Sequence, residues 1–215
     1  VRMRPRTLDE IAGQTQLLKK GSPLRALADA EALSSVSVIL WGPPGTGKTS
    51  IAHALAASSS RKFVELSAVT AGVKDVRAVM EQAQAHRELY GSGTLLFLDE
   101  IHRFTKAQQD ALLPGVENGW VTLVAATTEN PSFSVISPLL SRSLLLRLNL
   151  LTEEDLAALV TQALIAPHGL GGAFTLSTEA QSALIAFASG DARRALTSLE
   201  AAAQAADADG ERMIS

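Results

Sequence analysis

The sequence predicts an α/β protein, with a five-stranded parallel sheet flanked by helices and a small all-helical part after it. Two observations support this fold class. Up to about residue 150, short apolar runs alternate with segments of helical spacing, and that alternation is typical of parallel strands joined by crossover helices. Beyond residue 151, helix-start signals replace the apolar runs. We therefore expect two domains, residues 1–150 and residues 151–215.

The composition excludes several classes of protein. The chain has 215 residues, of which 47% are hydrophobic and 19% charged, so it can bury a core and is not a disordered chain. A net charge of −3 excludes a protein that coats nucleic acid by bulk charge. The absence of cysteine excludes disulfides and thiolate metal sites. No apolar run reaches the roughly 18–20 residues that a membrane span requires, so we expect no membrane partner.

The first half of the chain holds two strand–helix pairs. Residues 36–41 are largely apolar and stop at Gly-Pro-Pro-Gly, which predicts a buried strand. A helix over residues 48–57 follows. Residues 62–66 form the second predicted strand, and residues 73–89 show apolar side chains at helical spacing. The sequence Gly-Ser-Gly at 91–93 ends that helix.

Three further strands complete the predicted sheet. Residues 95–98 are continuously apolar, as expected for a strand covered on both faces. Residues 106–116 read as a helix whose end is disturbed by Pro114. The last two predicted strands are residues 121–126 and 144–148.

The tail shows three helix starts. Thr152 and Thr178 each begin a sequence that resembles a capping box, and Asp191 is placed to cap a third helix that runs to about residue 206. Residues 174–176 are the one candidate strand in this part.

A phosphate-binding loop is the strongest chemical signal. The motif G-x-x-x-x-G-K-[ST] is matched by Gly42, Pro43, Pro44, Gly45, Thr46, Gly47, Lys48 and Thr49. It lies after a predicted strand and before a predicted helix, as the motif requires. Its glycines let backbone N–H groups turn toward phosphates, Lys48 should reach the β- and γ-phosphates, and the Thr49 hydroxyl should bind Mg²⁺. A chance glycine-rich turn would not match both motif and context.

Two carboxylates follow the third predicted strand. Asp99 would hold Mg²⁺, directly or through water, and Glu100 would act as the general base toward the attacking water. The alternative is a solvated acidic turn, which the nearby phosphate loop disfavours. Because a hydrolase must activate water whereas a phosphotransferase uses its acceptor, the pair favours ATP hydrolysis.

Other polar residues allow two interpretations each. Thr127 and Thr128 end the fourth strand and could orient water or touch the γ-phosphate, or simply form a turn. Arg142, before the fifth strand, and Arg193, in the last helix, could serve phosphate charge or pair with surface carboxylates. His102 is not expected to bind a metal, because no second histidine has ligand spacing.

Taken together, these residues resemble a known group. The sequence is similar to AAA+ ATPases of the clamp-loader clade, and more closely to the RarA/MgsA family of replication-associated recombination proteins, which includes the Werner-helicase-interacting protein. The strings that carry the resemblance are residues 4–14, 39–49, 68–75, 99–114, 126–133 and 190–196. Phosphate-loop motifs are shared by many ATPases, but His-Arg-Phe-x-Lys-Ala-Gln-Gln-Asp and Thr-Thr-Glu-Asn-Pro-Ser-Phe are far more selective.

The resemblance implies a P-loop NTPase fold of AAA+ type with a helical lid, and it implies roles for five residues. Thr128 takes the sensor-1 position, with Thr127 as the less favoured choice. Arg142 takes the position of the arginine finger, which acts on ATP bound to a neighbouring subunit. Arg193 takes the sensor-2 position, and the segment around Pro5 and Ile11 corresponds to the part that packs on adenine.

The resemblance also implies the function. We expect an ATPase that uses Mg²⁺, is stimulated by DNA, and acts at stalled replication forks on single-stranded, forked or gapped DNA together with single-strand-binding protein. We expect a bacterial cytoplasmic, nucleoid-associated protein, or a nuclear one in a eukaryote. The family forms homo-oligomers through a C-terminal domain that we expect to be absent from this chain, so the chain should hydrolyse ATP slowly. The alternatives are a clamp-loader or branch-migration AAA+ subunit and, less favoured, a small-molecule phosphotransferase.

Overall fold

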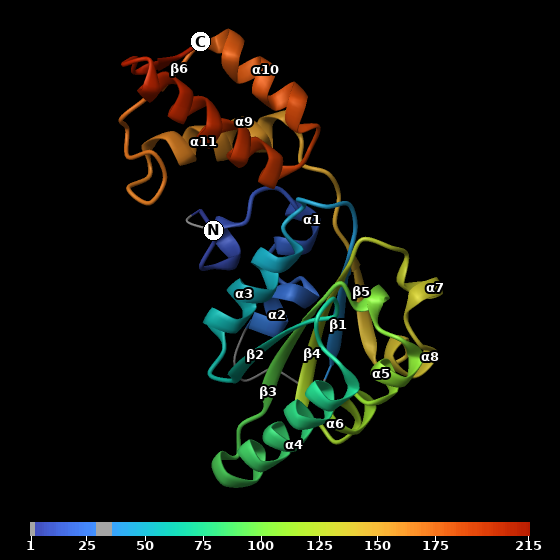
Figure 1. Ribbon diagram of the computed structural model, residues 1–215. Helices are drawn as coiled ribbons and strands as arrows, with labels where there is room; N and C mark the ends of the chain where they lie inside the picture. The colour runs from blue at the N-terminus through green and yellow to red at the C-terminus, as the bar shows by residue number, and fades with distance from the viewer. Residues whose placement is uncertain (1–2, 29–35) are drawn as a thin grey trace.

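A five-stranded parallel sheet forms the centre of the larger part of the molecule (Figure 1). The structure is a computed structural model that describes residues 3–28 and 36–215; residues 1–2 and 29–35, which fall within the first predicted domain, lie outside the described residues. The sheet order is β2-β3-β4-β1-β5. The strands are β1 (Ser37–Trp41), β2 (Lys62–Ser67), β3 (Thr94–Asp99), β4 (Val121–Thr127) and β5 (Ser143–Arg147). The predicted parallel sheet is thus confirmed.

The register brings the carboxyl ends of the strands to one edge. Trp41 of β1 pairs with Thr127 of β4, and Ser67 of β2 pairs with Asp99 of β3. Since every pair in this sheet is parallel, the residues that follow β1, β3 and β4 meet at the same edge. Ligand sites of open parallel sheets lie at this edge.

Helices cover both faces of the sheet, as Figure 1 shows. One face carries η1 (Leu8–Glu10), α1 (Thr15–Leu18), α2 (Pro23–Ala28) and α3 (Lys48–Ser58). The other carries α4 (Val73–Tyr90), η2 (Ile101–Arg103), α5 (Lys106–Asp110), α6 (Leu113–Glu117), α7 (Pro131–Ser134) and α8 (Ser137–Leu140). In β1, Val38 and Leu40 enter the first cluster and Ile39 the second, because successive strand residues point to opposite faces.

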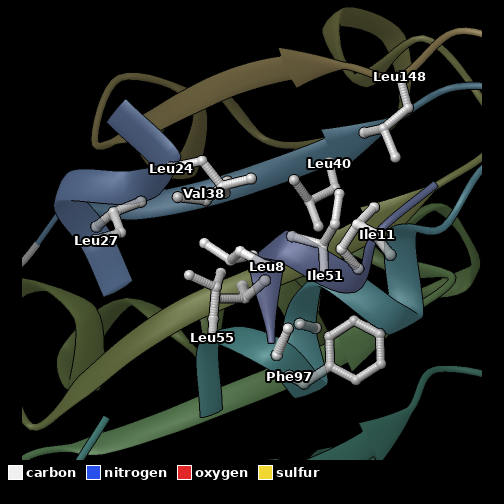
Figure 2. Packing of buried hydrophobic residues seen from close by; sticks show 14 of the residues in the cluster. Leu8, Ile11, Leu24, Leu27, Val38, Leu40, Ile51, Leu55, Phe97 and Leu148 are labelled. Atoms are coloured by element: carbon white, nitrogen blue, oxygen red, sulfur yellow. The ribbon is translucent and has the colours of Figure 1, made fainter. Parts of the chain in front are cut away.

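The first cluster joins the amino-terminal segment to the sheet. Leu8 and Ile11 lie among Leu40, Ile51 and Phe97 (Figure 2). Leu40, Ile51 and Phe97 are completely buried. Leu8 and Ile11 are themselves 3% and 8% exposed. Burial of each such side chain is worth about 1.5–3 kcal/mol, so this segment packs stably on the sheet although η1 has only three residues.

The carboxyl-terminal helical part has its own core. It consists of α9 (Glu153–Ile165), α10 (Thr178–Ala188) and α11 (Ala192–Ala208). These helices bury Leu156, Val160, Leu184 and Leu199 against one another. The part is not all-helical as predicted, because β6 (Thr175–Leu176) pairs in parallel with β7 (Met213–Ile214). The candidate strand at 174–176 acquires its partner only when the chain returns after α11.

Helix boundaries differ from the predictions in two places. The helix expected at 106–116 is two helices, α5 and α6, and Pro114 lies in the first turn of α6, where a missing N–H costs nothing. The cap of α10 is Ser177, whose side chain accepts the Ala180 N–H, so the capping box predicted from Thr178 is wrong by one residue. The capping box at Thr152 and the cap at Asp191 are confirmed. In the part of the chain that the structure describes, no helix is long and apolar enough to span a membrane.

Candidate active site

The phosphate loop connects β1 to α3 and lines a cavity of about 760 Å³. Gly45 and Gly47 have φ angles of 69° and 99°, in the left-handed region that glycine adopts without strain. At Gly42 a Cβ would overlap the Leu148 carbonyl oxygen, so only glycine fits there. The loop therefore has the backbone that the motif predicts, and residues 44–50 face the cavity.

Lys48 is buried beneath this loop. Its ammonium group donates to the carbonyl oxygens of Gly42, at 2.8 Å, and of Pro43, at 2.7 Å. Burial lowers the pKa of Lys48, while the charges of Glu100 and Asp99 act in the opposite direction. Because a lysine has three donors, these two bonds leave one for a phosphate oxygen.

The two carboxylates lie at the same cavity. Asp99 is the last residue of β3, and both Asp99 and Glu100 line the cavity with the phosphate loop. Glu100 has a φ angle of 58°, which costs a residue with a Cβ about 1–2 kcal/mol. The Asp99 carboxylate accepts the Glu100 N–H at 3.1 Å, and this bond supports the sharp turn after the strand.

The two threonines at the end of β4 have different surroundings. Thr127 is completely buried. Its hydroxyl lies 2.9 Å from His102 Nδ1 and accepts the Glu129 N–H at 3.0 Å. Thr128 is exposed and lines the cavity. Of the two residues left open by the spacing, only Thr128 can therefore touch a bound nucleotide.

The start of α11 lies on the phosphate loop. The Ala192 N–H donates to the Gly45 carbonyl oxygen at 3.1 Å. Asp191 packs so closely that a methyl group on Gly45 would overlap its carboxylate. Arg193 lines the cavity, and its charge helps to lower the pKa of Lys48 after the larger effect of burial. The resemblance implied that Arg193 reaches the nucleotide from the helical part, and the structure adds a direct backbone contact between α11 and the phosphate loop.

The amino-terminal segment closes another side of the cavity. Pro5 and Ile11 line it together with Leu159 and Leu170 of the helical part. This apolar wall suits the aromatic ring of a nucleotide base. The structure thus places both predicted residues beside the phosphate loop.

Gln14 anchors that segment, and sequence reasoning missed it. Its side-chain amide donates to the carbonyl oxygens of Asn149, at 2.7 Å, and of Thr46, at 3.3 Å. Its side-chain oxygen accepts the Asn149 N–H at 3.0 Å. Only 6% of the residue is exposed. Gln14 therefore joins the amino-terminal segment, the phosphate loop and the connection that follows β5.

Arg142 is not brought to this cavity. It is not among the residues that line the cavity in the described part of the chain. Its guanidinium lies 2.8 Å from a Glu117 carboxylate oxygen and donates to the Pro138 carbonyl oxygen at 3.0 Å. In this structure the Arg142 guanidinium is thus occupied by Glu117 and Pro138 and is not part of the cavity wall of its own subunit.

The cavity fits Mg²⁺ bound with a triphosphate. Thr49 and Asp99 both line it. Over residues 3–28 and 36–215, no cluster of three or more His, Asp or Glu side chains forms a self-sufficient metal site. Magnesium in phosphate-transfer sites uses one or two protein oxygens and takes its other ligands from phosphates and water, so the hydroxyl and carboxylate match its needs.

Comparisons with known proteins agree with this geometry. Residues 38–149 match the model of the ATPase family associated with various cellular activities (AAA). The chain is 56% identical to an uncharacterized AAA domain-containing protein of Mycobacterium tuberculosis, over 98% of this chain and 46% of that protein. It is 45% identical to replication-associated recombination protein A of Escherichia coli, over 99% of this chain and 48% of that protein. The chain thus spans about half the length of the curated relatives that it matches.

Two further comparisons add a sequence relative named WRNIP1 and a solved structure of similar fold. The ATPase WRNIP1 of Dictyostelium discoideum is 40% identical over 94% of this chain and 23% of that protein. The Holliday junction branch migration motor RuvB of Thermotoga maritima superposes with a TM-score of 0.79 at 26% identity, over 100% of this chain and 70% of that one. The resemblance seen in the sequence is therefore confirmed: the chain belongs to the AAA family of ATPases, and its homologues include replication-associated recombination protein A and WRNIP1.

Proposed function

We propose that this chain binds and hydrolyses ATP as the motor part of a protein that acts in replication-associated recombination. One observation carries the proposal: a single cavity is lined by the phosphate loop with Lys48, by Asp99 and Glu100, and by Arg193. These are the cationic, metal-binding and basic groups that phosphoryl transfer to water requires.

Each residue has a defined task. The loop N–H groups and the amino end of α3 bind the phosphates, and Lys48 neutralises charge on the β- and γ-phosphates. Thr49 and Asp99 would hold Mg²⁺, which neutralises charge on the phosphate oxygens when it is bound. Glu100 accepts the proton of the attacking water, so that the O–P bond forms as the bond to the ADP oxygen breaks.

Three residues complete the site. Thr128 orients the water or the γ-phosphate from the end of β4. Arg193 reaches the phosphates from the helical part, which serves as a lid. Pro5 and Ile11 pack on the adenine.

Arg142 acts on a neighbouring subunit. Its position outside the cavity of its own chain supports a role between subunits of a homo-oligomer. The ion pair with Glu117 must break for the guanidinium to reach another subunit's ATP. An arginine supplied in this way is worth about 10³–10⁵ in rate, so the chain should hydrolyse ATP slowly as a monomer.

The names of the relatives support the biological setting. Relatives are called replication-associated recombination protein A, so we propose that the whole protein acts on single-stranded, forked or gapped DNA at stalled forks in the bacterial cytoplasm. Single-strand-binding protein is the proposed partner there, and DNA is expected to stimulate hydrolysis. The likeness to RuvB favours branch migration as the second candidate.

The test is phosphate release from ATP by the whole protein, alone and with gapped DNA, single-stranded DNA or a four-way junction. Strongest stimulation by gapped or single-stranded DNA supports the first proposal, and strongest stimulation by the junction supports the second. Lys48→Ala should abolish ATP binding, and Glu100→Gln should bind ATP without turning it over. Glu153→Gln, an exposed acid at the start of α9, is the matched control. Normal turnover by Glu100→Gln would reject the proposed base, and silence with ATP alone would favour a phosphotransferase.

A further inference from the structure

His102 bridges the ends of two strands at the edge of the cavity. Its side chain is only 9% exposed. One ring nitrogen, Nε2, lies 3.1 Å from a Glu100 carboxylate oxygen, and the other, Nδ1, lies 2.9 Å from the Thr127 hydroxyl. The Glu129 carboxylate is the other titratable group near the ring, 4.0 Å from Nε2. Motif reasoning considered His102 only as a metal ligand and gave it no role.

The partners define which nitrogen carries the proton. A carboxylate can only accept, so the 3.1 Å contact between Nε2 and the Glu100 carboxylate is favourable when Nε2 carries a proton. The Thr127 oxygen already accepts the Glu129 N–H. Its hydroxyl proton lies within reach of His102 Nδ1, at 2.9 Å, and of the Glu129 carbonyl oxygen, at 3.4 Å. With a proton on Nε2, the ring has a favourable contact on each side, with Glu100 through Nε2 and with Thr127 through Nδ1.

The Glu100 side chain takes its orientation from the contact with His102. The Asp99 carboxylate holds the Glu100 backbone N–H, but it does not orient the Glu100 side chain, which is 30% exposed. A glutamate side chain has three rotatable bonds, and fixing them costs conformational entropy. In the described part of the chain, the Glu100 carboxylate contacts the His102 ring, and the ring in turn bonds the buried Thr127 hydroxyl.

We propose that His102 is a positioning residue that orients the Glu100 carboxylate toward the attacking water and ties that orientation to the end of β4. The proposal rests on the proposed role of Glu100 as general base. Thr127, the second partner of the ring, directly precedes Thr128, which faces the nucleotide. If the end of β4 shifts when the γ-phosphate is bound or lost, His102 would therefore transmit that shift to the Glu100 carboxylate.

The kinetic test separates positioning from binding. His102→Phe removes the hydrogen bond to Thr127 and the polar contact with Glu100 but keeps a ring. We expect kcat to fall about 10- to 100-fold, the cost of misplacing a reacting group by about 1 Å, with KM for ATP unchanged within about twofold. His102→Gln retains an N–H donor that can reach Glu100 and should recover part of kcat. The matched control is His86→Gln. His86 lies on α4 and bonds the Ser92 hydroxyl just after the helix, so this variant should have the kcat and KM of the unmodified protein.

A spectroscopic test does not need activity. Long-range ¹H–¹⁵N correlation spectra of the histidine rings, with His102 assigned by the His102→Gln variant, should show a His102 ring that carries a proton on Nε2. Thr127→Val should change the Nδ1 resonance and Glu100→Gln the Nε2 resonance. A ring protonated on Nδ1 alone would place no proton between His102 and Glu100 and would overturn the proposed positioning role.

The two tests also distinguish this inference from the proposed function. If Glu100→Gln is inactive and His102→Phe, folded and binding ATP normally, keeps full kcat, the positioning role is wrong and the proposed base stands. If Glu100→Gln turns over normally, the base assignment is wrong, and the positioning role is wrong with it.

Discussion

Replacement of Gln14 by alanine should loosen three segments at once. The side chain joins the amino-terminal segment to Thr46 of the phosphate loop and to Asn149 after β5 through three hydrogen bonds. At about 1 kcal/mol for each bond, Gln14→Ala should lower the free energy of unfolding by about 2–4 kcal/mol. The lower end applies where water replaces the lost partner at Asn149, which is exposed.

The backbone at this position provides an internal check. Gln14 has a φ angle of 55°, and a residue with a Cβ in that region is strained by about 1–2 kcal/mol. Gln14→Gly loses the same three bonds but releases that strain. We therefore expect the glycine variant to be about 1 kcal/mol more stable than the alanine variant, although glycine is the more flexible residue in the unfolded chain.

The assay is urea unfolding, monitored by circular dichroism and by tryptophan fluorescence. An m-value that is the same in the variant and the unmodified chain shows that the change lies in stability and that unfolding stays two-state. Gln16→Ala is the matched control, because it removes only the remaining and longest contact of the Gln14 side chain, a 3.4 Å hydrogen bond from the exposed Gln16 amide to the Gln14 side-chain oxygen; its effect should stay within about 0.5 kcal/mol. A loss below about 1 kcal/mol for Gln14→Ala, or a glycine variant less stable than the alanine variant, would refute this reasoning.

Three other perturbations test separate features. Gly45→Ala should lower the free energy of unfolding in urea by about 2–4 kcal/mol, because of left-handed backbone strain and because the new methyl group displaces the Asp191 cap. In an Asp191→Ala background, where no carboxylate overlaps that methyl group, the loss should be about 1 kcal/mol smaller. Burial lowers the pKa of His53 in the folded state from 6.5. Between pH 6.5 and that lower pKa the unfolded state binds more protons, so stability falls as the pH is lowered through this window and levels off below it. The melting temperature of the unmodified chain relative to His53→Gln should therefore drop from pH 7.5 to 5, and a constant difference would contradict this. Arg142→Ala and Lys48→Ala, each inactive alone in the whole protein, should recover turnover when mixed, and no recovery would favour a role of Arg142 within its own subunit.

Local motifs allowed much of this site to be predicted. The phosphate loop is contiguous, and its glycine and lysine positions carry their chemistry wherever the fold places them. Asp99 and Glu100 could be placed beside it because an apolar strand ends in them and parallel strands end at one edge. The same logic predicted that Thr127 or Thr128 would lie near, but the alternation along β4 and the turn after it decided that only Thr128 faces the cavity.

Contacts between distant segments could not be predicted in this way. Gln14 carries no motif of its own, and its three bonds reach residues up to 135 positions away. The bridge from Glu100 through His102 to Thr127 likewise depends on the register of β3 and β4.

The sequence by itself determined the order of strands and helices and the identity of the phosphate loop and acidic pair, because these follow from hydrophobic periodicity and from residues adjacent in the chain. Only the tertiary structure decided that α11 contacts Gly45, that Arg142 pairs with Glu117 and does not line the cavity of its own subunit, and that the His102 ring lies 3.1 Å from the Glu100 carboxylate. Such contacts depend on side-chain directions and on the packing of separate elements, and no local pattern encodes either.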